Sequence, residues 1–495
     1  MRVESFLLDS ARRFPEKTAL VAGAARLTYR ELLSRSIGLA GELRRQGVAR
    51  GDRVVIFLHN SPEAVIAVFA TLLAGGVFSV VNPGTKADKL AYILNNCTAK
   101  ALLTEPRLAA IAAEARPLAP ALGATLVAPF PDAAEASLPF PGIDLDLAMI
   151  AYTSGSTGFP KGVMMTHANI VAAATSITTY LESSPDDVVL SVLPLAFDYG
   201  LYQALMCAKV GATLVLEKSF AYPAVLIEKM RAERVTGFPL VPTLAAMLLQ
   251  MKSLEPGMFP SLRYVTNTAA ALPVAHIERL RMLFPGARLY SMYGVTECKR
   301  CTWLPPAELE RRPGSVGIPI PGTEAWIVDD TGDRVPPGTV GQLVVRGAHV
   351  MQGYWEEPEA TRRALRPGPY PWEKVLYTGD LFRADEEGFL YFVGRMDDII
   401  KTRGEKVSPK EVENVLYELA GVREAAVIGV PDPLLGNAIK AILATDGSLT
   451  ERDVIRHCAA RLEEFMVPAS VEFRGELPKS DNGKISRREL AAEAA

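Results

Sequence analysis

Residues 1–140 alternate between short apolar runs and stretches in which apolar positions recur at helical spacing. Residues 29–45 have this spacing behind Thr28, a residue that caps helix N-termini well. Residues 54–58 form a continuous apolar run typical of a buried strand, and a helical segment follows Pro62. Strand-like runs return later at 188–194, 212–216, 235–239 and 262–266. Strands that alternate with helices predict an α/β fold with mostly parallel sheets covered on both faces.

One segment is apolar enough to resemble a membrane span. Residues 64–81 carry no charge, but Gly75 and Gly76 divide them. The second part, 77–81, is β-branched and aromatic and precedes a turn at 82–84. This pattern predicts a helix that ends at a glycine and then a buried strand, so we expect no transmembrane helix.

The pattern changes beyond residue 315. Strand-like runs at 324–328 and 342–347 are separated by turn sequences at 330–333 and 336–338. Such a succession predicts an antiparallel, barrel-like β subdomain.

The C-terminal residues predict a small α+β domain. Helical patterns and strand-like runs alternate at 409–419, 422–430, 450–462 and 471–473. At 495 residues the chain exceeds what one hydrophobic core usually supports. We therefore predict an N-terminal domain at 1–396 and a C-terminal domain at 397–495.

Composition narrows the class of protein. Hydrophobic residues make up 49% of the chain and the formal charge is −3, with Lys and Arg scattered, which argues against a nucleic-acid-binding protein. Five cysteines and no recognisable signal peptide predict a reducing, cytoplasmic location. Cys298 and Cys301 form one Cys-x-x-Cys pair without a second pair nearby, so we expect buried thiols rather than a zinc site.

The most informative segment is 152–162, which reads YTSGSTGFPKG after an apolar run at 147–151. Glycines let backbone N–H groups face an anion, hydroxyls add donors, and a lysine supplies charge, so this loop predicts phosphate binding. It precedes a helix predicted to start at His167. It is not a Walker A loop, because Gly162 follows Lys161 where that motif has Ser or Thr for magnesium. The metal ligand must then come from elsewhere. The alternative is a flexible surface linker.

Other motifs follow this loop in order: 293–297 (YGVTE), 377–380 (YTGD), 394–401 (GRMDDIIK) and 478–485 (PKSDNGKI). Together with 28–32 (TYREL), the series closely resembles the adenylate-forming superfamily of acyl-CoA synthetases, peptide-synthetase adenylation domains and luciferases. The resemblance extends from residue 28 to Lys484. It implies a large N-terminal domain that binds ATP and the acid, and a small mobile C-terminal domain.

The resemblance also implies an ATP site. The β- and γ-phosphates would be held by Thr153, Ser154, Gly155, Ser156, Thr157, Gly158 and Lys161. The adenosine would be held by Asn267, Thr268, Ala269, Ala270, Met292, Tyr293, Gly294 and Thr296. Asp380 would accept from the ribose hydroxyls, Arg395 would reach the ribose or the α-phosphate, and Glu297 would be the magnesium ligand.

Lys484 would be the central catalytic residue, assisted by Thr153, Lys161 and Glu297. By resemblance it bridges the incoming carboxylate and the α-phosphate, where charge develops in the transition state. Neighbouring Lys479 is expected to be a solvated lysine. Asp397 matches the hinge about which the C-terminal domain rotates, and the loop at 402–407 would line the thiol tunnel afterwards.

The acyl-substrate pocket is predicted at Phe197, Asp198, Tyr202 and Arg300. In relatives that activate amino acids, an Asp after Phe at this position pairs with the substrate ammonium, so Asp198 favours a small amino acid, β-amino and dicarboxylic forms included. The cationic partner could equally be Lys299 or Arg300, and protein groups could satisfy Asp198 altogether.

The combined prediction is an AMP-forming ligase that uses ATP and Mg²⁺. It makes an acyl-AMP with release of pyrophosphate and then a thioester on the phosphopantetheine of CoA or of a separate carrier protein. The alternatives are a fatty or aryl acyl-CoA synthetase, an adenylating enzyme with an amine or hydroxyl acceptor, and a non-catalytic nucleotide-binding relative. Lys161, Glu297 and Lys484 are all present, which argues against the last.

Overall fold

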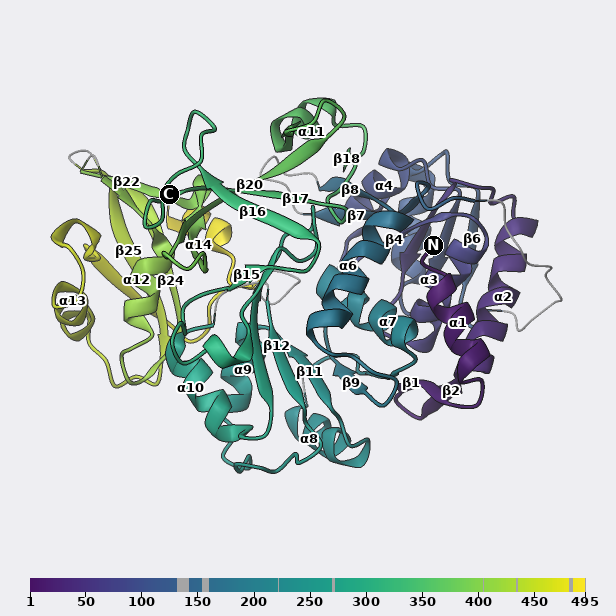
Figure 1. The fold of residues 1–495 in the computed structure, drawn as a ribbon, viewed down its shortest axis with the longest axis horizontal. Helices are drawn as coiled ribbons and strands as arrows, with labels where there is room; N and C mark the ends of the chain where they lie inside the picture. The colour runs from purple at the N-terminus through teal and green to yellow at the C-terminus, as the bar shows by residue number, and fades with distance from the viewer. Residues whose placement is uncertain are drawn as a thin grey trace.

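The computed structural model describes residues 1–130, 142–153, 160–220, 222–268, 272–403, 405–432, 435–479 and 484–494. Figure 1 shows the helices and mostly parallel strands of the N-terminal half, an antiparallel sheet in green, and the yellow C-terminal part beside them. The predicted α/β class is confirmed, and the candidate site is built at the edges where these sheets meet.

The first sheet has the strand order β18-β8-β7-β4-β3-β5-β6. Its strands are β3 (Arg53–Phe57), β4 (Val77–Val80), β5 (Ala101–Thr104), β6 (Ala124–Val127), β7 (Leu147–Thr153), β8 (Lys161–Thr166) and β18 (Gly353–Tyr354). Strands β7, β4, β3, β5 and β6 are parallel, and β8 and β18 add an antiparallel edge.

The second sheet has nine strands, in the order β15-β14-β13-β12-β11-β9-β10-β1-β2. Its strands are β1 (Thr18–Ala22), β2 (Ala25–Thr28), β9 (Val188–Ser191), β10 (Thr213–Leu216), β11 (Gly237–Leu240), β12 (Tyr264–Asn267), β13 (Arg288–Tyr293), β14 (Thr302–Trp303) and β15 (Ile318–Pro319). The interior from β13 to β1 is parallel, so the carboxyl ends of β9, β11, β12 and β13 lie at one edge.

Helices cover both faces of these sheets. One continuous core contains strands of both sheets together with α1 (Ser5–Arg13), α2 (Tyr29–Arg45), α3 (Pro62–Leu73), α6 (His167–Tyr180), α7 (Asp198–Val210), α8 (Pro223–Ala232), α9 (Pro242–Leu249) and α10 (Val274–Leu283). Alternate residues of β3 and β4 face a second core with α4 (Ala87–Asn96) and α5 (Ala109–Ala115). Thr28 is the N-cap of α2, as predicted, and it forms a capping box with Glu31.

The apolar segment at 64–81 folds as predicted into a buried helix, α3, followed by strand β4. Every α3 residue from Ala64 to Leu73 is buried, because the helix packs inside the core. In the part of the chain that the structure describes, no helix is long and apolar enough to cross a bilayer.

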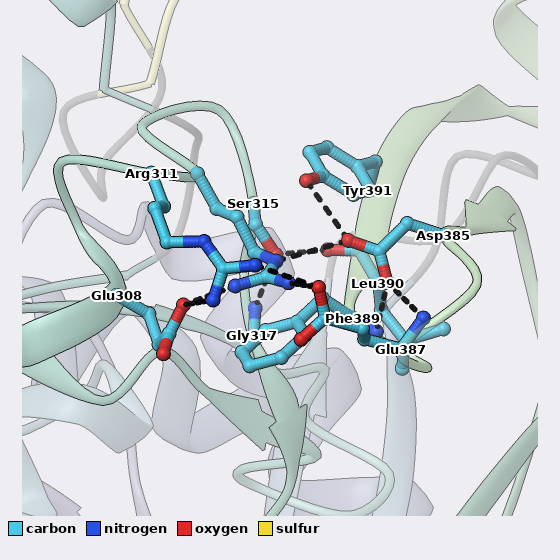
Figure 2. A network of polar contacts seen from close by, with 10 residues as sticks. Glu308, Arg311, Ser315, Gly317, Asp385, Glu387, Phe389, Leu390 and Tyr391 are labelled. Atoms are coloured by element: carbon cyan, nitrogen blue, oxygen red, sulfur yellow. Dashed lines mark hydrogen bonds and ion pairs between the residues drawn. The ribbon is translucent and has the colours of Figure 1, made fainter.

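An antiparallel sheet follows, as predicted from residue 315 onward. It consists of β16 (Thr323–Val328), β17 (Gly341–Gly347), β19 (Leu365–Pro367), β20 (Lys374–Ala384) and β21 (Leu390–Arg395), with α11 (Pro358–Ala364) beside it. Figure 2 shows the polar cluster that fastens the β20–β21 hairpin to the segment after β14. At its centre the buried Arg312 pairs with Glu308, Asp385 and Glu387 and lies 3.9 Å from the centre of the Phe389 ring.

The residues beyond this sheet form hydrophobic clusters of their own. They comprise β22 (Ile400–Thr402), β23 (Glu405–Val407), α12 (Pro409–Leu416), β24 (Val422–Asp432), β25 (Gly436–Thr445), α13 (Glu451–Ala459), β26 (Ser470–Arg474) and α14 (Arg487–Ala494). A short 3-10 turn, Met396–Asp398, joins them to β21 and contains Asp397. The segment predicted as a loop at 402–407 lies within the β22–β23 hairpin, apart from residue 404, which is outside the described residues.

Candidate active site

The predicted site residues come together at the carboxyl edge of the parallel strands. Asn267 ends β12 and Tyr293 ends β13, while the segment after β9 leads into α7 at Asp198. Parallel α/β sheets bind ligands at this edge, because strand ends and the following loops converge there.

The two ends of the predicted phosphate loop are held side by side. Thr153 and Lys161 are opposite each other where β7 pairs with β8, and the Thr153 hydroxyl lies 3.5 Å from the Lys161 carbonyl oxygen. The loop leads into strand β8, and α6 then begins at His167, as predicted. The predicted phosphate ligands Ser154, Gly155, Ser156, Thr157 and Gly158 lie outside the described residues.

A residue that the sequence gave no reason to select links this loop to the predicted magnesium ligand. The hydroxyl of Tyr354 donates to Oε1 of Glu297 at 2.7 Å. Its ring lies under Lys161, whose Nζ is 5.6 Å from the ring centre. Tyr354 is on β18, which pairs with β8, and the neighbouring Met351 N–H donates to the Glu297 carbonyl at 2.8 Å. Pairing of distant strands creates this contact, so no local sequence signal could have revealed it.

Glu297 suits magnesium for a chemical reason. Its carboxylate accepts a hydrogen bond from Tyr354, whose ring lies near Lys161 and which is on a strand next to the phosphate loop. No group of three or more His, Cys, Asp or Glu side chains able to hold a metal occurs among the described residues. Mg²⁺ bound to nucleotides typically takes one or two protein carboxylates and completes its shell with phosphate oxygens and water. A single carboxylate at this position therefore fits the predicted Mg²⁺–ATP site.

Tyr293, Asp380 and Arg395 form one polar group around the buried carboxylate of Asp380. The Tyr293 hydroxyl donates to Asp380 at 2.6 Å, and Nε of Arg395 donates to the other carboxylate oxygen at 3.2 Å. Burial raises the pKa of Asp380, and Arg395 opposes that rise. The Tyr293 ring packs on Phe382, with ring centres 4.8 Å apart. Three residues predicted to hold adenosine are thus joined by direct contacts.

The other predicted adenosine residues lie around this group. Asn267 and Thr268 are buried, and Sδ of Met292 is 3.0 Å from the Tyr180 hydroxyl. Gly294 sits against the backbone: a Cβ there would be 2.0 Å from the Lys299 carbonyl oxygen, so only glycine fits. Thr296 is half-buried, whereas Ala269 and Ala270 lie outside the described residues.

Lys484 reaches this site from the far end of the chain. Its Nζ lies 6.0 Å from the centre of the Phe197 ring, at the start of α7. Partial loss of hydration lowers the pKa of Lys484, although the residue remains exposed to solvent. The negative charges of Asp198 and Asp380 raise this pKa again in part. Charges from the predicted acyl pocket and the predicted ribose site therefore both act on this one ammonium group.

Lys479 differs from the prediction. It is only partly exposed and pairs with Glu424 at 2.8 Å and Glu476 at 2.6 Å. Because β24 brings Glu424 beside the segment, Lys479 is a structural ion-pair partner rather than a solvated lysine.

Asp198 has a cationic neighbour within the protein. Nζ of Lys299 lies 3.8 Å from the Asp198 carboxylate. Of the two candidate partners, Lys299 and Arg300, it is therefore Lys299 that pairs with Asp198. The neighbouring Arg300 stacks instead over Tyr199, with 5.1 Å from the guanidinium carbon to the ring centre. Tyr202, Lys299 and Arg300 are all buried, so the predicted acyl-pocket region contains buried positive charge.

Cys298 and Cys301 flank these cations. Both are fully buried, and their sulfur atoms are 2.9 Å apart. Their burial agrees with the expectation of buried thiols, and it raises the pKa of Cys298, whereas the neighbouring His349 lowers it.

Comparison with known proteins identifies the family. The model of the AMP-binding enzyme family matches residues 7–355, and the model of the AMP-binding enzyme C-terminal domain matches 411–484. The chain belongs to the AMP-binding enzyme family. It is therefore an AMP-forming acid–thiol ligase with an α/β adenylate-forming fold, as its motifs predict.

Members of the AMP-binding enzyme family resemble the chain over its whole length. A feruloyl-CoA synthase of Amycolatopsis is 35% identical over 98% of this chain and 98% of that enzyme. A long-chain-fatty-acid–CoA ligase of Bacillus subtilis is 32% identical over 99% of this chain and 94% of that ligase. ATP-bound MatB of Rhodopseudomonas palustris superposes with a TM-score of 0.90 at 30% identity, covering 100% of this chain and 99% of MatB.

A further solved relative bears on the metal. The O-succinylbenzoate Coenzyme A synthetase of Bacillus subtilis, in complex with ATP and magnesium ion, superposes with a TM-score of 0.88 at 29% identity over 98% of both chains. ATP and magnesium thus occur together in a family member of the same fold.

Proposed function

We propose that this protein is an acyl-CoA ligase for a short carboxylic acid that carries a second polar group. The observation that supports it most is the position of Lys484, which lies beside Phe197 and interacts electrostatically with Asp198 and Asp380. One ammonium thus faces both the predicted acid pocket and the predicted ribose site. An acid carboxylate and the α-phosphate of ATP must meet at such a point.

In the first step, an acid oxygen bonds to the α-phosphorus and the bond to the bridging oxygen breaks, releasing pyrophosphate. Lys484 would stabilise the charge that develops on the transferring group. Thr153 and Lys161 would hold the phosphates that leave, and Asp380 and Arg395 would hold the nucleoside. Magnesium, held by Glu297 and phosphate oxygens, would supply further positive charge.

In the second step, a thiol attacks the acyl carbonyl, the thiol proton is lost, and AMP leaves. Lys484 lies beside the predicted acid pocket. We propose that the C-terminal part rotates about Asp397 to admit the thiol, with the boundary of the two domains at 396 and 397. The β22–β23 hairpin would then line the path of the thiol.

CoA is the proposed acceptor, because the curated relatives named above are CoA ligases or CoA synthases. The phosphopantetheine of a separate carrier protein presents the same thiol and is the second candidate. An experiment distinguishes the two candidate acceptors: after the adenylate has formed, AMP release is measured with free CoA and with a phosphopantetheinylated carrier protein.

A short acid is favoured by the side chains at the predicted pocket. Tyr199, Tyr202, Lys299 and Arg300 are all bulky and buried there. A long acyl chain would have to displace them and would meet charge rather than apolar surface. The small amino acid predicted from Asp198 remains a candidate, since its ammonium could share that carboxylate with Lys299.

The test is ATP–pyrophosphate exchange over a panel of short diacids, amino acids, aryl acids and fatty acids. We expect strong exchange with a short acid bearing a second polar group and weak exchange with fatty acids. Strongest exchange with a long-chain or unsubstituted aryl acid would overturn the proposed substrate size and polarity.

A further inference from the structure

We propose that the second group of the substrate is an anion, most simply a carboxylate, recognised by Lys299 and Arg300. This rests on the proposed function and specifies its substrate as a short acid with two carboxylates. The evidence is a surplus of buried positive charge at the start of α7.

The ammonium group of Lys299 is buried close to Asp198. Its side chain is 2% exposed, and its Nζ has no hydrogen-bond partner among the described residues. The carboxylate of Asp198 is 3.8 Å away, close enough to attract but too far for a hydrogen bond. An ammonium group has three donors, so Lys299 can still bind a substrate oxygen.

The backbone at Lys299 supports a role in binding. Its φ of 65° lies in the left-handed region that non-glycine residues seldom adopt. The turn doubles back tightly, with the Lys299 N–H donating to Val295 at 2.7 Å and Cys301 N–H donating to Tyr293 at 2.9 Å. Such conformations persist where the surrounding structure fixes them and are concentrated at functional sites.

Arg300 adds a second cation without a carboxylate of its own. It is 4% exposed and stacks over Tyr199, and its Nε has no acceptor among the residues that the structure describes. In the described residues it forms no ion pair. Burial raises the pKa of the nearby Tyr180 hydroxyl to about 12, and Arg300 opposes this shift. The tyrosine therefore remains a neutral neighbour near neutral pH and does not compensate the charge.

Charge balance distinguishes an anion from an amine. Two buried cations, Lys299 and Arg300, lie here, and Asp198 pairs with Lys299; Glu297 also acts on Lys299 but is the predicted magnesium ligand. An ammonium on the substrate would add a third positive charge, whereas a carboxylate would neutralise the group. Buried charge is costly unless it is paired, so the anion is the better complement.

The same contacts restrict the spacing of the two substrate carboxylates. Lys484, which would face the reacting carboxylate, lies 6.0 Å from the centre of the Phe197 ring, and Lys299 lies 3.8 Å from the carboxylate of the adjacent Asp198. The two recognition points are thus separated by about one side chain. This spacing suits malonate, succinate or glutarate rather than a long diacid.

The experiment compares ATP–pyrophosphate exchange for malonate, succinate and glutarate with the monoacids propionate, butyrate and valerate. It also includes β-alanine and γ-aminobutyrate, in which an amine replaces the second carboxylate. We expect kcat/KM for the best diacid to exceed that of its monoacid by roughly 100-fold or more, because the monoacid leaves buried cations unpaired.

Substitutions then locate the recognition. Arg300→Met should remove most of the diacid preference and leave KM for ATP within about threefold of the parent. Lys299→Met alone leaves Asp198 unpaired, so the double variant Asp198→Asn/Lys299→Met, which removes both charges, is measured beside it. Lys218→Met, at an exposed lysine, is the matched control and should keep the preference.

The outcomes separate this inference from the proposed function. Strongest exchange with an amino acid or a monoacid would overturn the anionic group but leave the ligase intact. A diacid preference that survives both Arg300→Met and Asp198→Asn/Lys299→Met would also overturn it. Absence of exchange with every acid would overturn the proposed function itself, and the inference with it. An equal rise of KM for ATP and for the acid in Arg300→Met would show that Arg300 serves the nucleotide instead.

Discussion

At the scale of single residues, the environment of Lys484 sets its protonation. Loss of surrounding water lowers the pKa of Lys484. Among the nearby charges that raise this pKa, the negative charge of Asp198 has the largest effect. A lysine with a lowered pKa loses its charge at a lower pH than usual, so adenylation should decline on the alkaline side below the ordinary lysine range.

Asp198→Asn should move that decline to still lower pH, because it removes the charge that favours protonated Lys484. The alkaline limb of kcat/KM for ATP, which reports the free enzyme, measures the shift. Lys484→Met should abolish the limb, and Asp186→Asn, at an exposed position, should leave it in place. A limb that Asp198→Asn leaves unmoved or moves to higher pH would contradict this electrostatic account.

Tyr354 should act on magnesium through Glu297. Tyr354→Phe removes the hydroxyl that donates to Glu297 at 2.7 Å and keeps the ring near Lys161. We expect the magnesium concentration for half-maximal adenylation to rise roughly tenfold, equivalent to the loss of one hydrogen bond to a charged group. A fall in the maximal rate with no change in magnesium requirement would assign Tyr354 a merely structural role. Tyr370→Phe, on an exposed tyrosine, is the control.

At the scale of elements, the β20–β21 hairpin carries Asp380 and Arg395, and the cluster around Arg312 fastens it (Figure 2). Arg312→Ala removes buried ion pairs with Glu308, Asp385 and Glu387 and the stacking on Phe389. We expect a loss of roughly 2 kcal/mol in the free energy of unfolding, and weaker ATP binding. Urea unfolding and calorimetric titration measure the two effects.

The neighbouring Arg311 provides the matched control. Its side chain is 61% exposed and it pairs with Glu387 at 2.7 Å. Exposed ion pairs contribute little, so Arg311→Ala should cost less than about 1 kcal/mol. Equal losses in the two variants would show that burial of Arg312 does not strengthen the cluster.

Elements were predictable where local signals agree. Helix α2 begins after Thr28 and ends at Arg45 as its periodicity and N-cap predict, and α3 and β4 separate at Gly75-Gly76. Tyr293, Asp380 and Arg395, which the ordered motifs assign to an ATP site, are in direct contact, and their role in binding ATP stays a prediction. The partner of Asp198 was not decidable from the sequence, because Lys299 and Arg300 are adjacent and the turn alone determines which reaches it. Tyr354 and the pairing of Lys479 with Glu424 depend on distant strands and segments and left no local signal.

At the scale of the whole molecule, the two half-reactions should separate at Asp397. This residue lies in the short turn Met396–Asp398 between β21 and β22. Asp397→Pro restricts φ there and the conformation of the preceding Met396, which should hinder rotation. Acyl-AMP formation should survive within about threefold while thioester formation falls at least tenfold. Asp397→Ala, which keeps the backbone free, is the control. Equal loss of both steps would show that Asp397 is structural.

Lys484, contributed by the C-terminal part, is proposed to stabilise the adenylation transition state beside Phe197. Single-turnover acyl-AMP formation tests it most directly, with Lys484→Ala compared against Lys479→Ala, which removes the same charge a few residues away. We predict a loss of about 10² to 10³ in rate for Lys484→Ala with little change in ATP binding, and less than a threefold loss for Lys479→Ala. Comparable mild losses in both variants would contradict the account.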